Sequence, residues 1–354
     1  MVADVGLIAF PWCPSLETGR GHDTYAFHLF NYVFGTNLKI KVFPIIPMER
    51  LQQGVNKFDY FTKEALFFAK MVYRNSRIYH GISPIGAKTA VLAGKKPLIS
   101  TIHDAIPFIL HRDARQVYER LCIKLCCERS DEIIVSSQFT KRFLEKQLRF
   151  DSSKVTVIKY GVDHRFFSPK PKILRGKDKT VFSIVRWGNA EQILHAFQRI
   201  RKDVPNSTFL LGLTKSFETK LQAHIAQLTR KMDLQNSVKL LYDIPLNELP
   251  KYYRSADVYV SASLGGFSLT LLESMACGTP VVAFNLLDVP EYAGKSVVLV
   301  EPNNFEELAD QTISLLLDDK LHNSLSTRSL EESSQYSWQK MGSETVEIYN
   351  KLLS

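Results

Sequence analysis

The chain has 354 residues, 45% of them hydrophobic, and carries a formal net charge of +9. This length exceeds one ordinary hydrophobic core and predicts two domains, while the composition excludes a disordered chain and no run approaches the roughly 18–20 apolar residues of a membrane helix. Residues 1–165 hold 24 Lys and Arg against 15 Asp and Glu, so the whole positive excess is either solubilising charge or a surface for an anionic partner.

The first half of the chain alternates short apolar runs with longer helical patterns. The first run, which no basic segment precedes, is interpreted as a strand rather than a signal peptide. Alternation of this kind predicts a parallel sheet with helices on both faces, and continuous apolar runs indicate strands covered on both sides. The expected strands are 4–9, 40–45, 77–80, 97–101, 132–135 and 155–158, and the expected helices are 24–34, 61–73, 84–93, 113–128 and 138–147.

A Pro- and Lys-rich stretch at 168–179 is interpreted as a linker, after which the alternation resumes. An amphipathic pattern over 338–353 predicts a last helix. The chain is therefore expected to be α/β, with two doubly wound, Rossmann-like domains. The expected strands of the second half are 180–185, 208–212, 237–242, 257–260, 280–284 and 297–300, with helices at 189–201, 216–232, 246–254, 269–276, 304–317 and 320–333.

The five cysteines, Cys13, Cys122, Cys126, Cys127 and Cys277, match neither a zinc pattern nor a disulfide framework. They are expected to be buried thiols in a reducing compartment, which favours a cytoplasmic protein. No Asp-x-Asp motif suggests a divalent metal, so no metal and no cofactor are expected.

The segment 256–292 carries a pattern suited to a phosphate ligand. A strand ends near Ser261, a Gly-Gly turn follows, and a helix begins near Ser268. A glycine turn lets the backbone approach a ligand closely, and a helix N-terminus presents free N–H groups and a positive dipole end. Glu273, one to two turns into that helix, is placed to accept hydrogen bonds from paired hydroxyls such as those of a ribose.

This segment resembles the donor site of the retaining glycosyltransferases of family 4, whose pattern is roughly E-G-F-G-L-P-x-x-E-A-M-A-C-G-x-P-V-V. The resemblance implies the GT-B fold, with two Rossmann-like domains facing across a cleft. It also implies that Glu273 binds the donor ribose and that the backbone at Phe267, Ser268 and Leu269 meets the diphosphate and the sugar. The matching residues are Gly266, Phe267, Leu269, Glu273, Met275, Ala276, Cys277, Gly278, Pro280, Val281 and Val282.

Shorter matches extend the resemblance over most of the chain. Thr101-Ile102-His103-Asp104, at the end of an expected strand, resembles a family segment whose His lies near the reacting carbon of the sugar. We therefore expect His103 and Asp104 to be catalytic. Gly19 and Gly21 match the N-terminal glycine loop, which lines the acceptor side and approaches the donor phosphate, although they would also suit a plain turn. Tyr160-Gly161-Val162-Asp163 resembles the segment that ends the first domain.

The resemblance also implies the division of labour between the domains. Residues 1–167 are expected to bind the acceptor and residues 168–337 the nucleotide-sugar donor. The last helix, 338–354, with Trp338 and Tyr349, is expected to pack back on the first domain.

Two positions depart from the family pattern. Gly265 stands where the family has a first Glu that contacts the transferred sugar, and Gly188 stands where it has a Lys that neutralises the diphosphate. Arg186, which we also expect to be catalytic, and Lys215 are the substitute cations we expect at the phosphates, and a guanidinium binds phosphate in bidentate fashion. Arg186 would equally suit a plain surface cation.

The sequence thus predicts an enzyme that moves a hexose from a UDP- or GDP-sugar to a hydroxyl of a lipid or glycan, with retention of configuration. An anionic membrane surface is a possible partner of the basic half, which would place the protein at the inner face of the membrane. No nucleic-acid recognition motif is present, so no nucleic acid is expected as a partner. The alternatives are a catalytically impaired nucleotide-sugar-binding protein, which the two departures favour, and a nucleotide-sugar epimerase.

Overall fold

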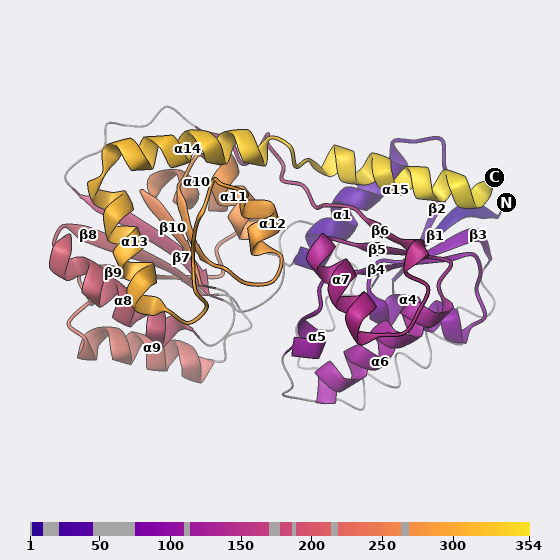
Figure 1. Ribbon diagram of the computed structural model, residues 1–354, viewed down its shortest axis with the longest axis horizontal. Helices are drawn as coiled ribbons and strands as arrows, with labels where there is room; N and C mark the ends of the chain where they lie inside the picture. The colour runs from indigo at the N-terminus through magenta and orange to yellow at the C-terminus, as the bar shows by residue number, and fades with distance from the viewer. Residues whose placement is uncertain are drawn as a thin grey trace. The chain divides into compact units, whose positions relative to one another are not determined.

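The computed structural model describes residues 2–9, 21–44, 75–109, 114–169, 178–185, 189–213, 219–262 and 269–354. The chain divides into two compact units, drawn in Figure 1. Unit 1 contains Met1–Gly161 together with Trp338–Ser354, and unit 2 contains Val162–Ser337.

Unit 1 is built on a six-stranded parallel sheet in the order β2-β1-β3-β4-β5-β6. The expected strands are confirmed to within a few residues, whereas the helix expected at 61–73 lies outside the described residues. The strands are β1 (Ala3–Ala9), β2 (Ile40–Pro44), β3 (Ser76–Gly81), β4 (Leu98–Ile102), β5 (Glu132–Val135) and β6 (Val155–Val157). The helices are α1 (Gly21–Phe34), α4 (Pro84–Leu92), α5 (Ile106–Ile109), α6 (Ala114–Arg129), α7 (Gln138–Gln147), the 3₁₀ turn η2 (Ser152–Lys154) and α15 (Trp338–Leu353).

Unit 2 is built on a second six-stranded parallel sheet, in the order β12-β11-β10-β7-β8-β9. The two parallel sheets confirm the expected fold class. The strands are β7 (Lys179–Val185), β8 (Ser207–Leu213), β9 (Val238–Tyr242), β10 (Val258–Ser261), β11 (Val281–Phe284) and β12 (Val298–Val300). The helices are α8 (Ala190–Asp203), α9 (Thr219–Lys231), α10 (Leu249–Ser255), α11 (Leu269–Ala276), α12 (Val289–Ala293), α13 (Phe305–Leu317) and α14 (Asp319–Ser333).

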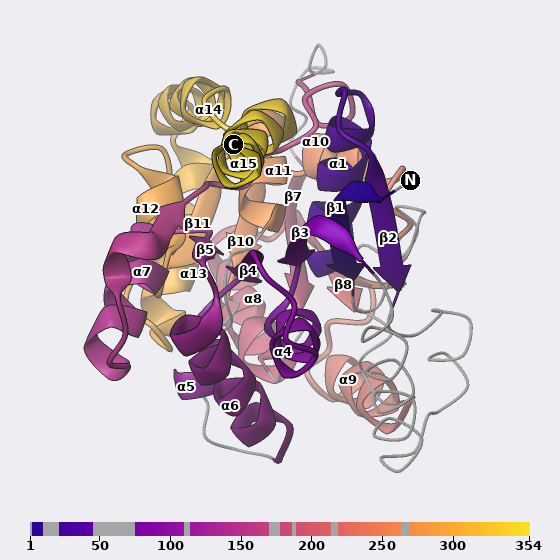
Figure 2. The same ribbon diagram turned by 90° about the vertical axis from the view of Figure 1, so that its right-hand side faces the viewer.

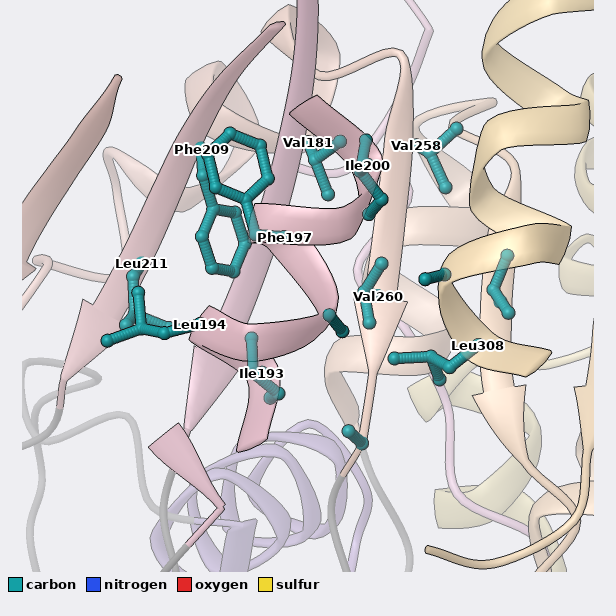
Figure 3. Close-up of a cluster of buried hydrophobic side chains, with 14 of the residues drawn as sticks. Val181, Ile193, Leu194, Phe197, Ile200, Phe209, Leu211, Val258, Val260 and Leu308 are labelled. Carbon is teal, nitrogen blue, oxygen red and sulfur yellow. The ribbon is translucent and has the colours of Figure 1, made fainter. Parts of the chain in front are cut away.

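The sheet of unit 2 is covered by apolar side chains on both faces, which explains why its strands are continuous apolar runs. On one face α8 and α13 pack against the strands, and the rings of Phe197 and Phe209 stack with centroids 4.8 Å apart (Figure 3). On the other face α10 and α11 bury an aromatic cluster that includes Phe182, Tyr253 and Tyr259. That second face carries α11, the helix with Glu273.

Helix α15 belongs to unit 1, although all of unit 2 precedes it in the sequence. It packs on α1 and β3, and Figure 2 views it nearly end-on with α1 beside it. Gly342 lies against Tyr32 so closely that a Cβ there would be 2.3 Å from Cγ of the tyrosine. Glycine at this point therefore sets the separation of the two helices. None of the described helices is both long and apolar enough to cross a membrane.

Candidate functional site

The helix that carries Glu273 follows β10 through residues 263–268, which lie outside the described residues. Gly265, Gly266, Phe267 and Ser268 fall within that gap, and Leu269 is the first residue of α11. Glu273 lies one turn further along and is 7% exposed. A buried carboxylate needs hydrogen-bond donors, because an unpaired charge in a protein interior is costly.

Tyr253, on α10, supplies one of those donors. Its hydroxyl donates to Oε2 of Glu273 over 2.9 Å, and its ring is fully buried. Burial, followed by the neighbouring Glu273 carboxylate, raises the pKa of Tyr253 well above its ordinary value, so the hydroxyl keeps its proton and remains a donor. Phe182 and Tyr259 pack edge-on against the Tyr253 ring with centroids 5.3 and 5.2 Å away. The orientation of Glu273 is therefore set by a rigid aromatic cluster.

The end of α11 is joined by a hydrogen bond to α10, the helix that carries Tyr253. Gly278 adopts a φ of +72°, a left-handed conformation that suits glycine at a helix C-terminus. The next residue, Thr279, donates from Oγ1 to the backbone oxygen of Tyr253 over 2.7 Å. The glycine turn thus fixes α10 against α11, and with them the Tyr253–Glu273 pair.

Three loops leave the sheet of unit 2 at one edge. Because β10, β7 and β8 are parallel neighbours, the segments after Ser261, Val185 and Leu213 all begin at the carboxyl edge. The expected residues Arg186 and Lys215, and the substituted Gly188, lie in these segments but outside the described residues. Asn189, which follows one of the loops, donates from Nδ2 to the backbone oxygen of Ala262 over 2.8 Å and joins two of the loops. Parallel α/β sheets bind ligands at this edge.

In unit 1, His103 follows β4 at the carboxyl edge of the sheet and is 5% exposed. Both ring nitrogens have partners in the chain: Nε2 lies 2.7 Å from the backbone oxygen of Ile82, and Nδ1 bonds the hydroxyl of Tyr160. Ser136 donates from Oγ to the backbone oxygen of His103 over 2.8 Å, which holds the end of β4 beside the end of β5. The expected catalytic histidine is therefore held firmly by its own unit.

Asp104 is partly shielded from solvent beside His103. Its Oδ1 accepts the backbone N–H of Ile106 over 2.9 Å, which caps the short helix α5. Burial raises the pKa of the Asp104 carboxyl from 3.8 to about 6 despite that hydrogen bond. The group therefore exchanges its proton near neutral pH, as groups in functional sites often do.

A buried polar chain lies beneath His103. Tyr349 on α15 bonds Nδ1 of His80 with its hydroxyl over 2.6 Å, and Nε2 of His80 lies 2.7 Å from Oγ1 of Thr101. The hydroxyl of Tyr25 lies 3.2 Å from the same Thr101 oxygen, and its ring meets the His103 ring edge-on. Burial lowers the pKa of His80 to about 3, so the ring stays neutral. Sequence reasoning overlooked His80, a fully buried histidine within β3.

Of the expected glycine pair, Gly21 is the first residue of α1 and Gly19 lies outside the described residues. Four cysteines, Cys122, Cys126, Cys127 and Cys277, are buried free thiols, and Cys13 lies outside the described residues. Burial raises the pKa of Cys277 to about 12, so its thiol remains protonated. Within the described ranges no group of three or more His, Cys, Asp or Glu side chains is arranged to hold a metal ion.

Two family models match the chain in succession. Residues 20–166 match "Glycosyltransferase Family 4" and residues 167–331 match "Glycosyl transferases group 1". O-antigen chain mannosyltransferase B of Escherichia coli is 30% identical over 127 residues, which cover 36% of this chain and 33% of that protein. D-inositol 3-phosphate glycosyltransferase of Corynebacterium urealyticum is 23% identical over 261 residues, which cover 68% of this chain and 61% of that protein. The matches thus span between one third and about three fifths of these two relatives.

Solved structures resemble the chain over nearly its full length. Sucrose-phosphate synthase of Thermosynechococcus elongatus superposes with a TM-score of 0.82 at 18% identity, covering 98% of both chains. Anabaena HepE, determined in complex with UDP and glucose, superposes with a TM-score of 0.75 at 17% identity, covering 99% of this chain and 100% of that one. At such identities the likeness establishes the shared GT-B fold.

Proposed function

The chain belongs to the group 1 glycosyltransferases of family 4, enzymes that take a sugar from a nucleotide-sugar donor, and from this we propose that it transfers a hexose from a UDP- or GDP-sugar with retention of configuration. The observation that carries the proposal is the buried Glu273 carboxylate, oriented by Tyr253 one turn into α11. A carboxylate so placed accepts hydrogen bonds from the two ribose hydroxyls that every such donor presents.

The donor's diphosphate would meet the N-terminus of α11. We assign its binding to the backbone at Gly265, Gly266, Phe267, Ser268 and Leu269, where free N–H groups and the helix dipole favour an anion. Arg186 and Lys215 would add positive charge from the loops after β7 and β8, which leave the same sheet edge. These groups stabilise the negative charge that builds on the leaving nucleoside diphosphate without requiring a metal.

The reaction in this proposal needs no protein nucleophile. The sugar–phosphate bond breaks, its electron pair leaves with the diphosphate, and the acceptor oxygen bonds the anomeric carbon from the same face. The acceptor proton passes to the departing phosphate oxygen. Asp104 would bind the sugar at the carboxyl edge of unit 1 with the His103 ring lying beside it, and Gly19 and Gly21 would approach the donor phosphate from the start of α1.

The acceptor we propose is a lipid or glycan hydroxyl bound by unit 1. This proposal is supported by two relatives whose names are O-antigen chain mannosyltransferase B and D-inositol 3-phosphate glycosyltransferase. The positive excess of residues 1–165 favours an anionic acceptor or membrane surface. Vesicles of anionic phospholipid should therefore bind the protein at low salt and release it at high salt. Absence of binding at low salt would exclude the membrane partner.

A thermal-shift screen with UDP, GDP, ADP and their sugars tests the donor assignment. A nucleotide present at 100 times its Kd stabilises the folded protein by about 2.7 kcal/mol, so one nucleotide class should raise Tm clearly. Glu273→Gln should weaken that shift, and Glu291→Gln, a change on the short helix α12, serves as the control. Proton NMR of the product then reports the anomeric configuration, and an inverted product would refute retention.

The second candidate is a nucleotide-sugar-binding protein without turnover. It is favoured by Gly265, which replaces the carboxylate that the family uses on the sugar, and by Gly188, which replaces its loop lysine. Both candidates predict a nucleotide-dependent thermal shift. They differ in whether labelled sugar leaves the donor.

A further inference from the structure

The two hydrogen bonds of His103 define the position of its ring proton. The backbone oxygen of Ile82 can only accept, so Nε2, 2.7 Å away, carries the proton. In the neutral ring Nδ1 is then the acceptor, and its partner is the hydroxyl of Tyr160, which donates. The contacts of His103 therefore select one tautomer of the uncharged imidazole.

Tyr160 is itself held in place by neighbouring rings. It is 4% exposed and lies with its ring centroid 5.3 Å from that of Tyr25 on α1. The first residue of α15, Trp338, stacks on it with centroids 6.0 Å apart and planes inclined by 29°. Trp338 in turn stacks on His28 at 4.6 Å with nearly parallel planes. Two helices thus fix the direction from which the Tyr160 hydroxyl reaches His103.

We propose that Tyr160 is a positioning residue that keeps His103 neutral, with its proton on Nε2, during sugar transfer. This rests on the proposed function, in which His103 lies beside the transferred sugar. As the electron pair of the sugar–phosphate bond leaves with the diphosphate, positive charge develops on the anomeric carbon. A protonated imidazolium beside that carbon would oppose this charge and raise the barrier, whereas a neutral ring does not.

The neighbouring titratable groups do not replace Tyr160 in this role. Among the described residues, Tyr25 meets the ring edge-on, and burial raises its pKa to about 12, so it stays neutral. His80 is connected to Tyr25 through the Thr101 hydroxyl, and it also stays neutral. Asp104, the next residue, has a pKa of about 6 and titrates in the same range as an imidazole. The pH dependence of wild-type activity therefore contains the ionisation of Asp104. The effect of the Tyr160 hydroxyl is the difference in pH dependence between wild type and a variant that lacks this hydroxyl.

The first test observes the ring directly. In protein labelled with ¹⁵N-histidine, long-range proton–nitrogen correlation spectra distinguish the two tautomers and the imidazolium, and His103→Gln identifies the signal. Wild type should show the Nε2-protonated tautomer across the range in which the protein is folded. Tyr160→Phe, which removes only the hydroxyl, should let Nδ1 take up a proton as the pH falls. A wild-type ring protonated on Nδ1, or identical titration in both proteins, would overturn the proposal. Because no substrate is present, this result stands apart from the proposed function.

The second test is kinetic. A free imidazole, with a pKa of about 6.5, is about nine-tenths charged at pH 5.5, so kcat of Tyr160→Phe should fall by up to about tenfold from its value at pH 8 beyond any fall in wild type. Tyr349→Phe removes a hydroxyl from another buried Tyr–His pair, that with His80, and should keep the wild-type profile. Equal pH profiles for Tyr160→Phe and wild type would show a purely structural role and refute the inference.

Discussion

Replacing Asp104 by Asn should stabilise the protein, and should do so more at alkaline pH. The carboxyl has a pKa of about 6 in the folded state against an ordinary value of 3.8, because burial disfavours its charged form. The folded state therefore binds this proton more tightly than the unfolded state. Its contribution to stability is complete below the unfolded pKa and is lost as pH rises through about 6.

The size of the effect follows from the difference in pKa. A shift from 3.8 to about 6 corresponds to about 3 kcal/mol at pH 8, an upper value because the carboxyl keeps some solvent contact. At pH 5 about half of that cost remains, since the folded carboxyl is then mostly protonated. The advantage of Asp104→Asn should thus grow by about 1–1.5 kcal/mol between pH 5 and pH 8. Asparagine preserves the acceptor for the N–H of Ile106, so the cap of α5 is kept.

Urea denaturation of wild type and Asp104→Asn at pH 5 and pH 8 measures this difference. Asp151→Asn is the control, because hydrogen bonds from Ser153 lower the pKa of the exposed Asp151 carboxyl, so that variant should gain no stability at alkaline pH. An advantage that is equal at the two pH values, or a less stable Asp104→Asn at pH 8, would refute the reasoning. Greater stability combined with lost transfer activity would show that the carboxyl is retained for function at a cost to the fold.

Two further substitutions test the orientation of Glu273 in unit 2 and the packing of α15 on α1 in unit 1. Tyr253→Phe removes the hydroxyl bond to Glu273, and isothermal titration should show nucleotide binding weakened by about 1 kcal/mol, or roughly fivefold in Kd; unchanged affinity would mean that Tyr253 does not orient the carboxylate. Gly342→Ala places a Cβ 2.3 Å from Tyr32 and should cost about 1–3 kcal/mol in urea denaturation, whereas Gly35→Ala, 3.4 Å from the backbone oxygen of Tyr32, should cost clearly less; equal costs would contradict the close α1–α15 packing.

The sequence was informative where a local pattern determines structure. Continuous apolar runs between helical patterns predicted the parallel sheets, because such strands must be covered on both faces. Gly278 likewise marked the end of α11 before β11, and the polar residues after β4 marked the carboxyl edge of that strand. Helix α12 was overlooked, since its five residues with Pro290 near the start form too short a pattern to recognise.

The hydrogen-bond partners of the site residues could not be predicted from local sequence patterns. Tyr253 lies 20 residues from Glu273 and Tyr160 lies 57 residues from His103. No periodicity relates such pairs, because their contact depends on strand order and helix packing. The pairing of His80 with Tyr349, 269 residues apart, depends further on α15 joining unit 1 after the whole of unit 2.

The central claim is that the chain still turns over a nucleotide-sugar donor although glycine occupies position 265. Radiolabelled UDP-, GDP- and ADP-sugars, each incubated with the wild-type protein and with Glu273→Ala, test it directly by the release of labelled sugar to acceptor or water. Our account predicts release from one donor class by the wild type and its loss in Glu273→Ala. No release from any donor would contradict it, and a nucleotide-dependent rise in thermal stability without release would identify the second candidate, the binding protein without turnover.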